Sequence, residues 1–116
     1  MTMAYAVPEA AEVMDVAASF KVEQVWSSTE ARTTQAVRVG PEAIWLSRMP
    51  GDDRKRFLWL EFTLPGTNQR IRALGEVLPA PDASVRWTCV RFKHLFPDQQ
   101  RVVERFVSAH RPRMAA

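Results

Sequence analysis

Hydrophobic and polar residues alternate along most of the chain, and this pattern predicts a series of short β-strands. The clearest alternation runs from Phe57 to Leu64, where every second side chain is large and apolar. A period of two places Leu58, Leu60 and Phe62 on the same face of a strand. We therefore predict that these side chains form part of the core.

Five further strands are predicted from shorter or less regular patterns, at residues 20–26, 33–39, 43–47, 69–78 and 85–93. Pairs of Gly and Pro lie between several of them, at Gly40–Pro41, Pro50–Gly51 and Pro65–Gly66, and such pairs favour turns. A glycine inside the fourth of these segments, Gly75, predicts a local bulge or bend.

Helical spacing of apolar residues replaces the alternation near the two ends of the chain. Residues 98–110 predict a helix that begins after Pro97 and ends before Pro112. Its apolar stripe consists of Val102, Val103, Phe106 and Val107. A second helical pattern begins at Pro8, since proline is favoured in the first turn of a helix. Its apolar face would contain Val13, Met14, Ala17 and Phe20.

Six short strands followed by one helix favour a mainly β domain, built as a small antiparallel barrel or sandwich. The helix is expected to cover an open face or end of the strands and to bury its apolar stripe there. We predict one domain at residues 19–110, preceded by an extension at 1–18 that is a short helix or disordered. Residues 111–116 are predicted to be a tail.

Composition is that of an ordinary globular protein with a basic surplus. The 116 residues suffice for one domain, and the formal net charge is +3. Thirteen of the 16 basic residues are Arg, whose planar fork suits recognition of phosphates and carboxylates. No apolar run is long enough to span a membrane, and no secretory signal is visible at the start. With Cys89 as the single cysteine, these features favour the cytoplasm.

Side chains that could catalyse a reaction or hold a metal do not cluster in the sequence. Cys89, His94 and His110 show neither a nucleophile beside a base nor the spacing of metal ligands. Asp52 and Asp53 stand directly before three basic residues, which indicates a solvated loop rather than a cation site. We therefore predict a protein that is not an enzyme and that has no metal and no cofactor.

The second half of the chain, at about residues 36–108, resembles the PilZ family. The stretch 58–66 is similar to that family's hydrophobic strand ending in Leu-Pro, and 71–77 is similar to its next strand, which carries a Gly. Residues 90–92 resemble the strand that follows, and 102–107 resemble the closing helix. The resemblance implies a six-stranded antiparallel β-barrel with a C-terminal α-helix.

Members of this family bind cyclic di-GMP through Arg-x-x-x-Arg and Asp/Asn-x-Ser-x-x-Gly motifs, and both are altered here. If Ala43 corresponds to the final Gly, then Gly40 stands at the Ser and Arg38 at the Asp. Arg-x-x-x-Arg is absent, and the nearest basic residues are Lys21 and Arg32. Because lost pairing with polar ligand groups weakens binding strongly, we expect weak or absent binding. Residues that could still bind the dinucleotide in another geometry are Lys21, Arg32, Arg38 and Gly40.

Tryptophan and arginine on the outer wall of such a barrel suggest a second kind of site. Trp59 alternates with the predicted core residues, and Trp87 alternates in the same way with Thr88 and Val90. Both residue types are enriched at the energetic centres of protein interfaces. Either these rings are exposed for a partner, or the terminal helix or the N-terminal segment covers them. The candidate partner-binding residues are Trp45, Trp59, Arg70, Arg72, Arg86, Trp87 and Arg91.

These features favour a non-catalytic bacterial signalling adaptor that acts through protein contacts, and the resemblance implies an output in motility, pili or polarity. Two copies could pair through a sheet edge or through the outer tryptophans. One alternative function is a cyclic di-GMP receptor with non-standard ligands. Another is a small barrel that binds single-stranded nucleic acid through aromatic and basic residues. Against the latter, acidic residues interrupt the outer positions, at Glu23, Glu61, Glu76 and Asp82.

Overall fold

The computed structural model describes residues 15–49, 52, 56–80 and 84–110 of the chain. These residues form six strands and one helix in the predicted order. The elements are β1 (Val16–Val25), β2 (Ala31–Val39), β3 (Ala43–Ser47), β4 (Phe57–Thr63), β5 (Arg70–Val77), β6 (Trp87–Leu95) and α2 (Pro97–His110). Among the described residues, no helix has the length and apolar character needed to cross a membrane.

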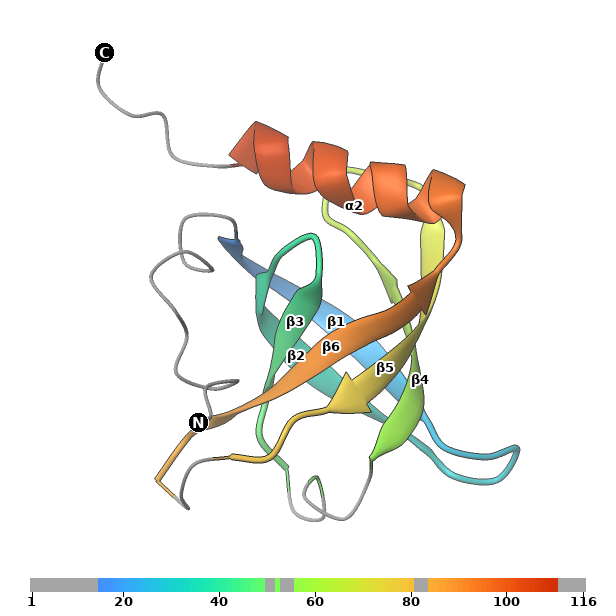
Figure 1. Ribbon diagram of the computed structural model, residues 1–116, viewed down its shortest axis with the longest axis vertical. Helices are drawn as coiled ribbons and strands as arrows, with labels where there is room; N and C mark the ends of the chain where they lie inside the picture. Colours follow the sequence, from blue (N-terminus) through green and yellow to red (C-terminus); the bar gives the residue numbers. More distant parts are fainter. Residues whose placement is uncertain (1–14, 50–51, 53–55, 81–83, 111–116) are drawn as a thin grey trace.

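The six strands form a closed antiparallel barrel in the order β1-β2-β3-β6-β5-β4, with β4 returning to β1 (Figure 1). The closing contact places Val22 opposite Phe62 and Val25 opposite Trp59. The predicted fold class, a mainly β barrel with a C-terminal helix, is thereby confirmed. Each of the described strands has a neighbour on both sides, but β4 pairs with β1 only at Val22–Val25, so pairing of two copies through a sheet edge stays a prediction.

The interior of the barrel is filled by alternate side chains of the strands. Leu58, Leu60 and Phe62 of β4 are buried there, as their alternation predicted. α2 lies across one end of the barrel, where Phe106 and Val107 join the same hydrophobic cluster (Figure 1). Burial of a large apolar side chain contributes about 1.5–3 kcal/mol, so this helix stabilises the closed barrel.

A register shift between β5 and β6 confirms the irregularity predicted at Gly75. The shift lies between Leu74 and Gly75. A Cβ atom on Gly75 would overlap Cγ1 of Val90 and would lie 3.2 Å from Cδ1 of Leu60. Glycine at this position therefore allows β5 and β6 to approach closely over the core.

β1 begins earlier than predicted, and this overturns part of the predicted N-terminal helix. Ala17 and Phe20 belong to the strand, and Phe20 is buried in the core. Phe20 lies two residues before the inward-facing Val22 and therefore on the same face of the strand, so the period of two extends upstream into the alanine-rich segment. Residues 16–18 therefore belong to the barrel and not to the predicted extension. The remaining part of the predicted helix, residues 8–14, lies outside the described residues.

The other boundaries differ from the prediction by one or two residues. β2 begins two residues early, because a hydrogen bond from the Trp26 N–H to the Glu30 carbonyl (3.0 Å) closes a turn and places Ala31 opposite Val25. β6 begins and ends two residues later than predicted. The predicted tail at 111–116 lies outside the described residues.

Candidate functional site

Asp15 and Arg38 form an ion pair where β1 begins and β2 ends. Nε of Arg38 donates to Oδ1 of Asp15 at 2.6 Å. The Asp15 side chain is buried, whereas that of Arg38 is partly exposed. The other carboxylate oxygen, Oδ2, is buried without a hydrogen-bond partner in the described part of the chain. The guanidinium of Arg38 therefore balances the charge of Asp15.

Gly40 provides the space that Asp15 occupies. A Cβ atom at Gly40 would lie 2.9 Å from Cβ of Asp15, which is closer than side chains tolerate. The N–H of Gly40 donates to the carbonyl of Ala43 at 2.8 Å and closes the turn between β2 and β3. Arg38 and Gly40, two of the residues predicted for cyclic di-GMP, are thus both used to accommodate Asp15 at this turn.

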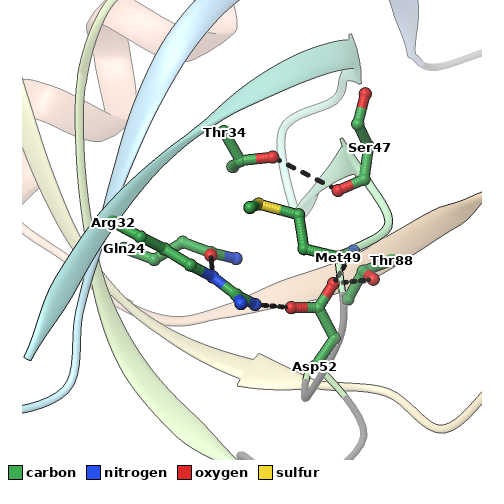
Figure 2. Close-up of polar contacts among 7 residues, drawn as sticks. All are labelled: Gln24, Arg32, Thr34, Ser47, Met49, Asp52 and Thr88. Carbon is green, nitrogen blue, oxygen red and sulfur yellow. Dashed lines mark hydrogen bonds and ion pairs between the residues drawn. The ribbon is translucent and has the colours of Figure 1, made fainter.

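A second polar cluster joins three strands to the connection between β3 and β4 (Figure 2). Arg32 of β2 forms an ion pair with Asp52 and donates from Nε to Oε1 of Gln24 at 2.8 Å. Oδ2 of Asp52 accepts from Oγ1 of Thr88 at 2.5 Å and from the N–H of Met49 at 2.9 Å. Both carboxylate oxygens of Asp52 are therefore satisfied by the barrel itself.

Asp52 is buried, so the prediction that it lies in a solvated loop is wrong. Its partners Arg32 and Thr88 are 20 and 36 residues away in the sequence, and the neighbouring charges give no sign of them. In Figure 1, β3 ends and β4 begins at the end of the barrel opposite α2. The Asp52 cluster therefore stabilises the second end of the barrel, as α2 stabilises the first.

Arg32 and Arg38 point to different surfaces and cannot hold one ligand together. Both lie on β2, and a separation of six residues corresponds to about 20 Å along a strand. Arg32 lies on the same face of β2 as the inward-facing Thr34 and Ala36. The pairing of β2 with β3 then shifts register between Ala36 and Arg38. After this shift Arg38 precedes the buried Val39 and faces outward.

Lys21 lies apart from both arginines, exposed on β1 opposite Gln35 of β2. Its chain neighbours Phe20 and Val22 are buried, so Lys21 points away from the interior. It forms no ion pair with any residue that the structure describes. The four candidate ligands for the dinucleotide therefore do not converge into one site: Arg38 and Gly40 share the β2–β3 turn, Arg32 lies inside the end that holds Asp52, and Lys21 lies on the wall.

Three predicted partner-binding residues, Trp59, Arg70 and Arg72, lie together on the outer wall. The guanidinium of Arg72 lies over the Trp59 ring, 4.7 Å from its centroid. Arg70 forms ion pairs with Glu23 and with Glu61, the latter at an Nη2–Oε1 distance of 3.4 Å. A cation–π contact contributes about 0.5–1 kcal/mol at an exposed site, so Arg72 holds the indole ring only loosely against the wall.

Arg91 belongs to a different cluster, which is centred on Glu76. Nη2 of Arg91 donates to Oε1 of Glu76 at 2.6 Å. Lys93 and Arg56 lie 3.9 and 3.8 Å from oxygens of the same carboxylate. The hydrogen bond from Arg91 and the nearby positive charges lower the pKa of Glu76, although partial burial opposes them. Arg91 therefore takes part in an ion cluster within the protein, on the barrel wall.

Trp45 is only 8% exposed, so its predicted place on an exposed docking surface is wrong. Its ring packs with Cys89, the residue opposite it on β6. Leu78, Ala80 and Val85 pack against this pair on the outside of the barrel. Trp45 therefore belongs to a small second core beyond the β3–β6 wall.

The Cys89 thiol is buried and poorly reactive. Burial and the negative charge of Asp15 raise its pKa to about 12, and Arg91 opposes this shift. A thiol with this pKa stays protonated at neutral pH and is a weak nucleophile. Within the described ranges, no three His, Cys, Asp or Glu side chains are grouped so that they could hold a metal ion.

Trp87 and Arg86 lie on a different part of the wall from Trp59. Trp87 is 39% exposed at the start of β6, opposite Ser47 of β3. Trp59 aligns instead with His94 of β6 through the intervening strand β5. His94 lies seven residues after Trp87 on β6, which corresponds to about 23 Å. The predicted mixed wall containing both tryptophans is therefore two separate surfaces.

A cleft of about 380 Å³ lies between the β2–β3 turn, β6 and α2. Its lining residues are Pro41, Glu42, Arg91, Phe92, Lys93, His94, Leu95 and Gln100. Arg91 and Lys93 already contact Glu76, which reduces the positive charge that they offer to an anion. Glu42 adds a negative charge at the same opening.

Asp15 and Asp52 form the ion pairs that hold Arg38 and Arg32, and neither acid was predicted as a site residue. The base at the acidic position of the motif, Arg38, could have prompted a search for an acid nearby, but the first strand was predicted to begin at residue 20, five residues after Asp15. Asp52 carried no such signal, since its partners come from distant strands.

No protein-family model matches this chain, and no curated protein sequence matches it. The solved structure of the Bacillus subtilis inhibitor of motility, MotI/DgrA, is similar in fold, with a TM-score of 0.67 and 14% sequence identity. The similarity covers 83% of this chain and 48% of that chain, so this chain spans about half the length of its structural neighbour. At this identity the likeness shows the fold alone, and the closed barrel with its C-terminal helix is PilZ-like.

Proposed function

We propose that this chain is a non-catalytic regulatory adaptor with a PilZ-like barrel, which binds another protein and does not bind cyclic di-GMP. The observation that carries the second part is the ion pair between Arg38 and Asp15. By the resemblance described above, the family has basic residues before the first strand and an acid in the later motif. Here the acid precedes β1 and the base ends β2, so the two charges have exchanged places.

This exchange opposes nucleotide binding at the β2–β3 turn. A phosphate there would meet the carboxylate of Asp15 and would compete with it for Arg38. Separating a largely buried ion pair leaves a charge without compensation, which costs roughly 2–3 kcal/mol when one partner is partly exposed. Arg32 cannot replace Arg38, since its guanidinium contacts Asp52 and Gln24.

Exposed aromatic rings support a role in protein contacts. Phe57, Trp87 and Phe96 are 46%, 39% and 51% exposed, and two of them stand beside arginines in the sequence. Aromatic rings and arginine are the side chains most enriched where proteins bind one another. Since the structural neighbour is an inhibitor of motility and the resemblance implies motility, pili or polarity, we propose a partner in one of these systems.

Affinity purification with the full chain as bait tests this function. The tagged chain would be incubated with an extract of the bacterium that encodes it, with and without added cyclic di-GMP. We expect one protein to be enriched to the same extent in both samples. Enrichment that requires the dinucleotide would contradict the proposal, as would enrichment of nucleic acid alone or of no protein at all.

The second candidate function is a cyclic di-GMP receptor with non-standard ligands, and the cleft beside the β2–β3 turn is the observation that favours it. Arg91 and Lys93 line this cleft, and both side chains are about half-exposed. A phosphate there would have to displace Glu76 from Arg91. Dinucleotide binding that is lost in Arg91→Ala and kept in Arg38→Ala would identify this function.

A further inference from the structure

An apolar band crosses the outer wall of the barrel without belonging to either hydrophobic core. Val25 of β1 lies opposite Trp59 of β4, and Trp59 lies opposite Leu74 of β5. Their neighbours along each strand are buried, so these three side chains point outward. Phe57 stands two residues before Trp59 on the same face and is exposed. We call Val25, Phe57, Trp59 and Leu74 the outer apolar band.

Two arginines lie on the faces of the aromatic rings of this band. Arg72 lies over Trp59, and Arg56 lies over Phe57 at 5.2 Å from the ring centroid. Arg56 and Arg72 are 76% and 54% exposed, and within the described part of the chain each approaches a glutamate through Nε, at 3.8 and 3.7 Å. Those distances are too long for hydrogen bonds, so both guanidiniums keep donors for an incoming carboxylate.

The charges around the outer apolar band favour an acidic partner. Among the described residues, the ion pairs on this side of the barrel join five basic side chains, Arg56, Arg70, Arg72, Arg91 and Lys93, to three acidic ones, Glu23, Glu61 and Glu76. An excess of two positive charges around an apolar surface attracts and orients negatively charged segments.

We propose that the outer apolar band binds an acidic segment of a protein partner that also carries an aromatic or large aliphatic side chain. The apolar side chain would contact Leu74 and Val25, and the carboxylates would pair with Arg56 and Arg72. This inference rests on the proposed adaptor function, for which it names the binding surface and the chemistry of the partner.

Nucleic acid and a second copy of the chain fit the band less well. The guanidinium of Arg72 covers the face of Trp59 on which a base would stack. A second copy would bring the same positive excess to the contact, which opposes its binding. An acidic segment does not need the covered face of Trp59, and its charge is opposite to the positive excess.

Binding of short synthetic peptides to the full chain, observed by NMR, tests the inference. The probes are one peptide of alternating Asp and Phe, one of alternating Lys and Phe, and one of alternating Asp and Ser. We expect the Asp/Phe peptide to shift the indole N–H signal of Trp59 more than those of the other three tryptophans. The other two peptides should bind about tenfold more weakly, because each lacks either the charge or the apolar side chain.

A charge reversal and a matched control locate the surface. Arg72→Glu should weaken binding of the Asp/Phe peptide about tenfold and strengthen binding of the Lys/Phe peptide. Arg101→Glu makes the same change of charge on the exposed side of α2 and should leave the affinity unchanged. Trp59→Phe removes one indole signal and so assigns it. Equal losses in the two charge variants would show diffuse attraction and would overturn the inference.

The remaining outcomes separate this inference from the adaptor function. A larger shift of Trp59 with oligo-dT than with the Asp/Phe peptide would overturn the inference in favour of nucleic acid. A shift that depends on protein concentration alone would overturn it in favour of a second copy. No shift of Trp59 with the Asp/Phe peptide would also overturn it, while a partner captured by the full chain would still support an adaptor that uses another face.

Discussion

Nε of Arg38 lies 2.6 Å from Oδ1 of Asp15, and this contact joins the residue before β1 to the end of β2. The backbone pairing beside it places Val16 opposite Val39, so the ion pair closes the hairpin at its open end. Gly40 completes the corner by leaving room for Asp15. The guanidinium of Arg38 is therefore directed at the protein's own carboxylate.

Arg38→Ala should lower the free energy of unfolding by roughly 2–3 kcal/mol, because it leaves Asp15 buried without its cation. The double variant Asp15→Ala/Arg38→Ala should lose clearly less than the sum of the two single variants. Urea unfolding of the four proteins measures the coupling. If the losses in free energy of unfolding were strictly additive, the ion pair between Asp15 and Arg38 would contribute nothing to stability.

Asp52→Ala should destabilise the fold by about 3 kcal/mol, since it leaves Arg32 and Thr88 without their buried partner. Thr88→Val removes one hydrogen bond to the carboxylate and should cost about 1.5–3 kcal/mol. Glu104→Ala, on the exposed side of α2, is the control and should change the stability by less than about 0.5 kcal/mol. Thermal or urea unfolding compares them. An Asp52 variant as stable as the control would contradict the buried cluster.

The alternation of apolar and polar residues predicted the strands in which neighbouring residues differ in polarity. Leu58, Leu60 and Phe62 alternate with less buried positions, so their face was evident. Trp45 stands between two apolar residues, and no period indicates which face it takes or that a separate core buries it. The position of Asp52 depends on strands 20 and 36 residues away, and local pattern carries no information on such contacts.

Gly75→Ala should destabilise the barrel by about 1–3 kcal/mol, because the added methyl group would overlap the side chain of Val90. Val90→Ala in the same chain removes that overlap, so the double variant should lose less than the two single variants together. Chemical unfolding measures all three proteins. If Gly75→Ala were as stable as the unmodified chain, the close approach of β5 and β6 would be refuted.

Cys89 should react slowly with iodoacetamide at pH 8 in the folded protein. Burial holds the thiol protonated, with a pKa of about 12, and also blocks access to the reagent. In denaturing urea the same thiol should react at the rate of a free cysteine. Mass spectrometry over time follows both reactions, and fast modification of the native protein would be inconsistent with this packing.

The contribution of Glu76 to stability should depend on pH. Its pKa is lowered below the ordinary value of 4.5 in the folded protein, mainly by the hydrogen bond from Arg91. The ionised form therefore stabilises the fold above about pH 4.5, and this contribution is lost as the pH falls through the lowered pKa. The stability difference between the unmodified chain and Glu76→Gln should shrink over that range. A difference that is constant from pH 7 to pH 3 would argue against the ion cluster.

Titration calorimetry of the full chain with cyclic di-GMP at physiological salt tests most directly whether the ion pair between Asp15 and Arg38 excludes the dinucleotide. We expect no saturable heat up to roughly millimolar dinucleotide, because Arg38 and Arg32 are held by Asp15 and Asp52. Saturable binding with a micromolar Kd that is abolished by Arg38→Ala would contradict the proposal, since it would show that the guanidinium leaves Asp15 for a phosphate.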